Sequence, residues 1–167
     1  MRLLRKIERK KWLDRKHHWV PAGEFCADPL GDLRTAQGAL SVWCVESDDD
    51  AYQVAAAIAA ILNFGNVDYL LIDETTLAEQ GFKLKSCPGQ SAAPSLNMTR
   101  HRDITCLTER SLLKLACLFR EKGESRTCAS TTIMQTLSAG IASKSIDLSQ
   151  VKPPWLKRMT EEGLLPL

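Results

Sequence analysis

The sequence lacks the features that mark exported and membrane proteins. No apolar segment near its beginning resembles a signal peptide, and no apolar run approaches the roughly 20 residues of a membrane-spanning helix. We therefore expect a cytoplasmic protein that does not enter a membrane. Hydrophobic residues make up 44% of the chain and charged residues 25%, which excludes a disordered protein. With 167 residues and no low-complexity linker, the chain should form a single domain, residues 1–167.

The cysteines lack the spacing of a disulfide framework or of a zinc site. There is no C-x-x-C pair and no closely spaced Cys/His pair, and the adjacent His17 and His18 should point apart. The six cysteines are Cys26, Cys44, Cys87, Cys106, Cys117 and Cys128. In a chain without an export signal, this pattern predicts free thiols, no metal site and no cofactor.

A recognisable catalytic signature is also missing. The run Arg100-His101-Arg102-Asp103 resembles the catalytic-loop triplet of protein kinases, but the glycine-rich loop, the strand lysine and the D-F-G motif are absent. His101 beside Asp103 could still act in acid/base chemistry. The alternative is a charged approach to a strand over 104–107.

What the chain does contain is a strand–helix–strand pattern between residues 39 and 73. Two apolar runs, Leu40–Val45 and Val67–Ile72, flank the alanine-rich helical segment Ala51–Leu62, whose first turn is capped by Ser47 or Asp48. This pattern predicts a βαβ crossover unit with parallel strands. The expected fold is α/β or α+β, with a small three- to five-stranded sheet and helices packed on it.

The second half of the chain should add helices. Amphipathic patterns predict helices over 109–121 and 131–142, whereas 87–97 and 126–130 have loop composition. The segment 154–165 after Pro153 forms an amphipathic tail. This tail could dock on its own core or on a second copy of the chain, giving a homodimer.

Positive charge is concentrated in residues 1–20. This segment holds eight basic and two acidic residues, a net charge of +6, while the other 147 residues carry 14 basic and 18 acidic residues, a net charge of −4. We expect an edge strand here, because charged side chains suit a sheet edge. Its mixture of basic and aromatic residues could bind nucleic acid, or it could be a solvated face. The nucleic-acid-binding candidates are Arg9, Lys10, Lys11, Trp12, Arg15 and Lys16.

Two groups of polar residues could contribute to a catalytic site. The first group, Asp28, Asp32 and Arg34, precedes the buried strand over 40–45. The second, Asp73 and Glu74, follows the buried strand over 67–72, where open α/β sheets tend to bind ligands. Each group could equally serve as a turn or a helix N-terminus. With His101, the catalytic candidates are Asp28, Asp32, Arg34, Asp73 and Glu74.

Three hypotheses about function follow. The first is an accessory or regulatory protein, not an enzyme, that acts by binding another protein or itself. The second is a nucleic-acid-associated protein that uses the basic N-terminal segment. The third is a small hydrolase or transferase, which requires several of the catalytic candidates to converge on one pocket.

Overall fold

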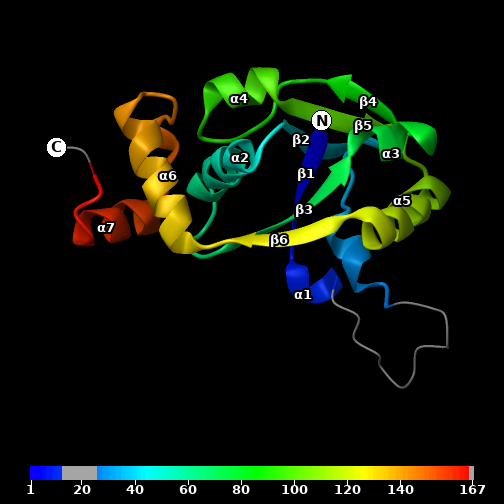
Figure 1. The fold of residues 1–167 in the computed structure, drawn as a ribbon, viewed down its shortest axis with the longest axis horizontal. Coiled ribbons are helices and arrows are strands. Elements are labelled where there is room, and N and C mark those ends of the chain that lie inside the picture. The colour runs from blue at the N-terminus through cyan, green and yellow to red at the C-terminus, as the bar shows by residue number, and fades with distance from the viewer. Residues whose placement is uncertain (13–25, 166–167) are drawn as a thin grey trace.

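A computed structural model describes residues 1–12 and 26–165, which form an α/β fold around one six-stranded open sheet (Figure 1). The strands are β1 (Arg2–Ile7), β2 (Leu40–Val45), β3 (Val67–Asp73), β4 (Lys83–Ser86), β5 (His101–Thr105) and β6 (Glu124–Cys128). The α-helices in the described ranges are α1 (Arg9–Trp12), α2 (Asp48–Ala60), α3 (Glu74–Glu79), α4 (Pro94–Thr99), α5 (Glu109–Lys122), α6 (Ser130–Ala142) and α7 (Pro153–Glu161). None of these helices is long and apolar enough to cross a membrane.

The order of the strands corrects the expected βαβ unit. The sheet runs β4-β5-β2-β1-β3-β6, and each neighbouring pair is antiparallel. Because β2 and β3 are both antiparallel to β1, they run parallel to each other and are joined by α2, as expected. They do not pair with each other, however, since β1 lies between them. The unit is therefore a split crossover.

The N-terminal strand lies in the middle of the sheet, although its charges had suggested an edge. Leu3 and Ile7 are buried on one face and Leu4 on the other, so both faces of β1 contribute to the core. Its arginines are accommodated by specific partners, Arg2 by an ion pair and Arg5 by backbone carbonyls. A strand buried on both faces is stable at the centre of a sheet.

The sheet has six strands, more than the expected three to five, and its edge strand β6 lies partly in 126–130, which was expected to be a loop. The edge strand β6 has the sequence Glu-Ser-Arg-Thr-Cys, and the other edge strand, β4, has the sequence Lys-Leu-Lys-Ser. Edge strands contact water, so they show little of the apolar alternation that reveals a buried strand. The loop composition of 87–97 also hides the short helix α4, which begins at Pro94.

Helices cover both faces of the sheet. On one face α2, α6 and α7 lie next to one another (Figure 1) and bury strand residues such as Trp43, Val45 and Leu71. On the other face α1, α5 and the 3-10 turn η1 (Asp28–Asp32) cover Val42 and Ile72. Burial on both faces explains why β2 and β3 are continuous apolar runs.

The local signals for α2 are borne out. Ser47 is the N-cap, and its hydroxyl accepts a hydrogen bond from the backbone N–H of Asp50 at 3.1 Å. Between Ala51 and Ala60, all residues except Tyr52 and Gln53 are buried. Small side chains on most of its surface let α2 pack closely against both the sheet and α6.

The C-terminal tail docks on the protein's own core. Trp155 and Met159 of α7 are completely buried, and Leu164 and Leu165 pack against the same cluster. A homodimer through 154–165 stays a prediction.

An ion-pair network ties the N-terminus of α2 to two strands, and it should make stability depend on pH. Asp48 accepts hydrogen bonds from Arg2 at 2.9 Å and from Arg126 at 2.7 Å, and these partners hold the pKa of Asp48 below its usual range. The carboxylate therefore stabilises the fold above its unfolded-state pKa, and this contribution is lost as the pH falls through the lower folded-state pKa.

Asp48→Asn should lower the melting temperature at pH 7, and its difference from wild type should shrink towards pH 2. The control is Asp49→Asn, since Asp49 is exposed in the same helical turn. An equal effect of both substitutions at pH 7 would assign the stabilisation to the helix dipole alone.

Candidate functional site

The candidate catalytic residues from the sequence do not meet in one pocket. Asp28 and Arg34 are exposed beside η1, and Asp73 and Glu74 lie at the junction of β3 and α3. Only His101, at the start of β5, is buried next to other reactive side chains.

Asp32, another of the catalytic candidates, has a structural role. Its carboxylate accepts hydrogen bonds from the backbone N–H of Glu8 at 2.7 Å, from the indole of Trp12 at 2.9 Å and from Lys11 at 3.1 Å. It thereby fastens α1 to η1, and all its strong acceptor sites face protein donors.

Of the nucleic-acid-binding candidates, some have structural partners and others are exposed. Trp12 is buried against Phe119, with ring centroids 6.2 Å apart, and Lys11 is paired with Glu8 and Asp32. Arg9 and Lys10 are exposed on α1. The remaining candidates, Arg15 and Lys16, lie outside the described residues. Nucleic-acid binding by this segment stays a prediction.

Three metal-ligating side chains converge where β4 and β5 lie side by side. A nitrogen of His101, the sulfur of Cys87 and a carboxylate oxygen of Asp103 all lie within 4.8 Å of one another. The thiol of Cys87 donates a hydrogen bond to Oδ2 of Asp103 at 3.0 Å, and Nε2 of His101 is 4.0 Å from Oδ1 of Asp103. In the described part of the chain, this is the one group of three or more such side chains.

The register of the sheet brings these residues together. His101 and Asp103 are two positions apart on β5, so their side chains lie on the same face of the strand. Ser86, the last residue of β4, pairs with Arg102, which brings the next residue, Cys87, beside His101. On the neighbouring strand β2, Ser41 pairs with Asp103, and its hydroxyl donates to Oδ1 of Asp103 at 3.2 Å.

The imidazole of His101 is held in one orientation. Its Nδ1 lies 3.1 Å from the backbone carbonyl of Cys87 and 3.3 Å from the Cys87 sulfur, and in the tautomer with the proton on Nδ1 the ring donates to that carbonyl. The ring meets Trp43 edge to face, with centroids 4.9 Å apart, and Gly89 packs against both rings. Fixing Nδ1–H on a carbonyl leaves the Nε2 lone pair free for a ligand, as in many metal-binding histidines.

Cys87 is not an activated nucleophile in this arrangement. Burial raises the pKa of its thiol, and the hydrogen bond to Asp103 raises it further, to about 11. A catalytic cysteine needs the opposite shift, towards the thiolate. The three side chains therefore do not form a cysteine–histidine–aspartate nucleophilic triad.

The donor set fits a zinc ion. Zinc binds cysteine sulfur, histidine nitrogen and carboxylate oxygen, with bonds of about 2.0–2.3 Å that place tetrahedral ligands roughly 3.5 Å apart. The ligand atoms of Cys87, His101 and Asp103 lie within 4.8 Å of one another, which is close to that spacing. The hydrogen bonds from Ser41 to Asp103 and from His101 to the Cys87 carbonyl would then orient two of the three ligands.

A pocket of about 370 Å³ opens beside these ligands. It exists because β1 and β2 pair only from Arg2 to Leu4 and then diverge, while β1 continues to pair with β3 as far as Ile7. Residues from the diverging strands, from α2 and from the loop after β4 line the opening. They are Arg5, Lys6, Ser41, Trp43, Ile58, Pro88, Gly89, Gln90, His101 and Asp103.

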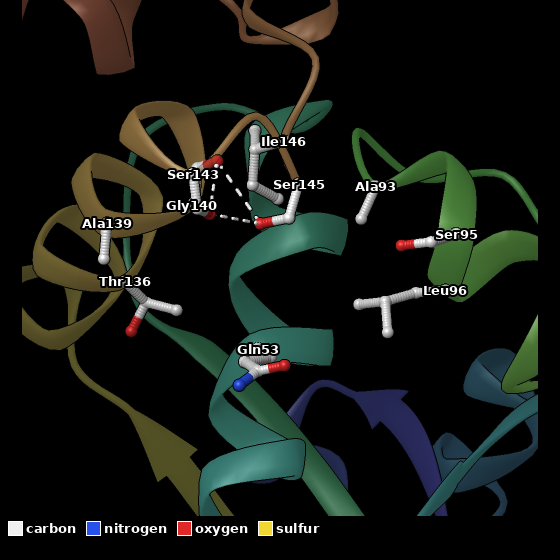
Figure 2. Close-up of a pocket in the computed structure, with 10 residues that line it drawn as sticks. All are labelled: Gln53, Ala93, Ser95, Leu96, Thr136, Ala139, Gly140, Ser143, Ser145 and Ile146. Carbon is white, nitrogen blue, oxygen red and sulfur yellow. Dashed lines mark hydrogen bonds between the residues drawn. The ribbon is translucent and has the colours of Figure 1, made fainter.

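A second pocket, of about 360 Å³, lies between α2, α4 and α6 (Figure 2). Gln53 of α2 lies between Leu96 on the α4 side and Thr136 on the α6 side, and Ser143 and Ser145 hydrogen-bond to the Gly140 carbonyl at its rim. The ten residues that line it include no acid, base, cysteine or histidine. Uncharged polar and apolar side chains share this lining, and the pocket offers no charged group for acid–base or metal chemistry.

Cys87 is the site residue that the sequence interpretation missed. Zinc motifs that can be identified in a sequence have ligands a few residues apart, but Cys87 and His101 are 14 positions apart and are brought together by the sheet register. Only a correct pairing of β4 with β5 could have revealed them as neighbours. Comparisons with protein-family models, with curated proteins and with solved structures gave no match for this chain.

Proposed function

We propose that this protein is a zinc-dependent hydrolase whose metal is held by Cys87, His101 and Asp103. The observation that carries the proposal is the convergence of these three ligand types within 4.8 Å, next to an open pocket. Structural zinc sites are closed by four protein ligands, whereas catalytic sites use three and leave the fourth position to water. The described part of the chain supplies three.

The chemistry of such a site is hydrolysis. A zinc ion lowers the pKa of its bound water to about 7 and polarises the bond under attack. With zinc held by Cys87, His101 and Asp103, hydrolysis of an ester would form a bond from the water oxygen to the acyl or phosphoryl centre, break the bond to the leaving alcohol and pass the proton to that alcohol. The products are an acid and an alcohol. His101 and Asp103 line the pocket, so a substrate there would face the metal.

The first experiment is a titration of the metal-free protein with Zn²⁺ by calorimetry, together with Co²⁺ absorption spectroscopy. The wild-type protein should bind one ion per chain, and the cobalt form should show a sulfur-to-metal charge-transfer band. Cys87→Ser should remove this band and weaken zinc binding at least about 100-fold, because an ideal soft ligand is lost. His101→Ala should weaken binding to a similar degree.

The matched control is Cys117→Ser, since Cys117 is an exposed cysteine on α5, away from the site. It should bind zinc as the wild type does. Circular dichroism on each variant separates loss of the ligand from loss of the fold. Equal zinc affinity in the two cysteine variants would refute the metal site. If zinc binds but p-nitrophenyl acetate and p-nitrophenyl phosphate are not hydrolysed faster than by Cys87→Ser, the hydrolase assignment fails.

A further inference from the structure

Basic side chains outnumber acidic ones in the pocket beside the proposed metal ligands. Arg5 and Lys6 line it, and among the described residues that line it Asp103 is the one carboxylate. If the proposed function holds and zinc binds there with the Cys87 thiolate, the metal, the thiolate and Asp103 cancel. The two basic side chains then remain without an equal negative charge in the pocket.

Among the described residues, Arg5 hydrogen-bonds to backbone carbonyls and not to a carboxylate, although Asp32 lies close enough for its charge to act on the guanidinium. It sits between the diverging strands, where Nη1 donates to the backbone carbonyl of Ser41 at 2.9 Å and Nη2 to that of Asp32 at 2.6 Å. Its Nε is buried without a hydrogen-bond partner among the described residues. The carboxylate of Asp32 is already shared by Lys11 and Trp12. A buried guanidinium held by carbonyls alone favours an anion nearby.

Lys6 is the second cation that lines the pocket, and it points to the opposite face of β1 from Arg5, which shares the face of Leu3 and Ile7. Its neighbour two residues earlier, Leu4, packs in the cluster that includes Trp43, so Lys6 projects from β1 towards the face that bears His101 and Asp103. Lys6 is exposed, which leaves its ammonium group able to reach a bound molecule. Lys85 extends the positive charge, since it pairs with Asp103 across β4 and β5.

We propose that the substrate of this site is a small molecule bearing an oxyanion, a phosphate or a carboxylate, which Lys6 binds directly and Arg5 attracts through its charge. The proposal rests on the zinc-dependent function above and specifies its substrate class. The pocket volume of about 370 Å³ is at the lower end of the range of ligand pockets, so the substrate is a small metabolite and not a polymer.

The test measures binding of inorganic phosphate and of acetate to zinc-loaded protein, by calorimetry at low ionic strength and without free zinc. The wild type should bind at least one of the two anions with millimolar affinity or better. Lys6→Ala should weaken that binding roughly 5- to 10-fold, as expected for a charge-assisted hydrogen bond. Lys157→Ala, which removes an exposed lysine from α7, should leave it unchanged.

The outcomes separate the two proposals. Each variant is first titrated with zinc, and Lys6→Ala should bind the metal as the wild type does because Lys6 is not a ligand. Lys6-dependent binding of phosphate alone assigns a phosphate ester, and of acetate alone a carboxylate. If zinc binds but neither anion does, or if Lys6→Ala and Lys157→Ala behave alike, the oxyanion proposal fails and the zinc site stands. Failure of zinc binding by the wild type overturns the proposed function itself.

Discussion

Replacing Trp155 with alanine should destabilise the protein by about 3–5 kcal/mol, the range found for large-to-small substitutions of buried tryptophan and phenylalanine. Trp155 is wholly inaccessible to solvent, and its ring packs against Phe64 with centroids 4.6 Å apart. The indole N–H donates to the carbonyl of Ala59 in the last turn of α2 at 2.9 Å. Removing the ring leaves a cavity between α2 and α7. Urea denaturation followed by circular dichroism would measure the change.

Trp155→Phe is the informative control, because it retains most of the ring and loses the N–H donor. The Ala59 carbonyl still accepts a bond from the backbone N–H of Leu62, so the cost should be only about 1 kcal/mol. A small effect of Trp155→Ala would show that α7 contributes little to the core. The docked position of the C-terminal segment would then be wrong.

Gly89→Ala should disable the proposed metal site without substituting any of its ligands. A Cβ atom at this position would lie 2.7 Å from ring carbons of both His101 and Trp43. Neither ring can retreat easily, because His101 is bonded to the Cys87 carbonyl and both rings are buried against each other. The imidazole must therefore tilt, and zinc affinity should fall about 10- to 100-fold, as for other changes in the support of a ligand. Overpacking should also cost about 1–3 kcal/mol of stability.

The comparison for this prediction is Gly31→Ala. The nearest atom to a Cβ at Gly31 is Nζ of Lys11 at 3.6 Å, an ordinary contact with a flexible side chain. This variant should bind zinc normally. Calorimetric zinc titration and thermal unfolding of both variants test the prediction. Unchanged zinc affinity in Gly89→Ala would mean that the loop after β4 does not hold the His101 ring.

Much of the fold could be predicted from local patterns. The buried strands β2 and β3, the capped alanine-rich helix α2 and the amphipathic helices α5 and α6 are all visible in the sequence, because each has an apolar period that matches its structure. The edge strand β6 was expected to be part of a loop, since contact with solvent removes that period. Its polar residues have the composition of a loop.

The position of β1 shows what local patterns could not provide. Leu3, Leu4 and Ile7 fit a strand as well as a helix, and the basic residues around them favoured an edge. Insertion between β2 and β3 depends on residues about 40 and 70 positions away, which present two open edges to β1. Pairing between distant segments leaves no local periodic signal.

The sequence by itself determined the secondary structure of the buried elements and the α/β class. Those properties follow from interactions between residues close in the chain. Only the tertiary structure decided that β5 begins at His101 and not at 104, so that His101 and Asp103 share a face of the strand, and that Cys87 joins them. It also decided that Arg5 and Lys6 line the adjacent pocket. The pairing of β4 with β5 and the divergence of β1 from β2 create this site, because sheet register brings together side chains that are far apart in sequence.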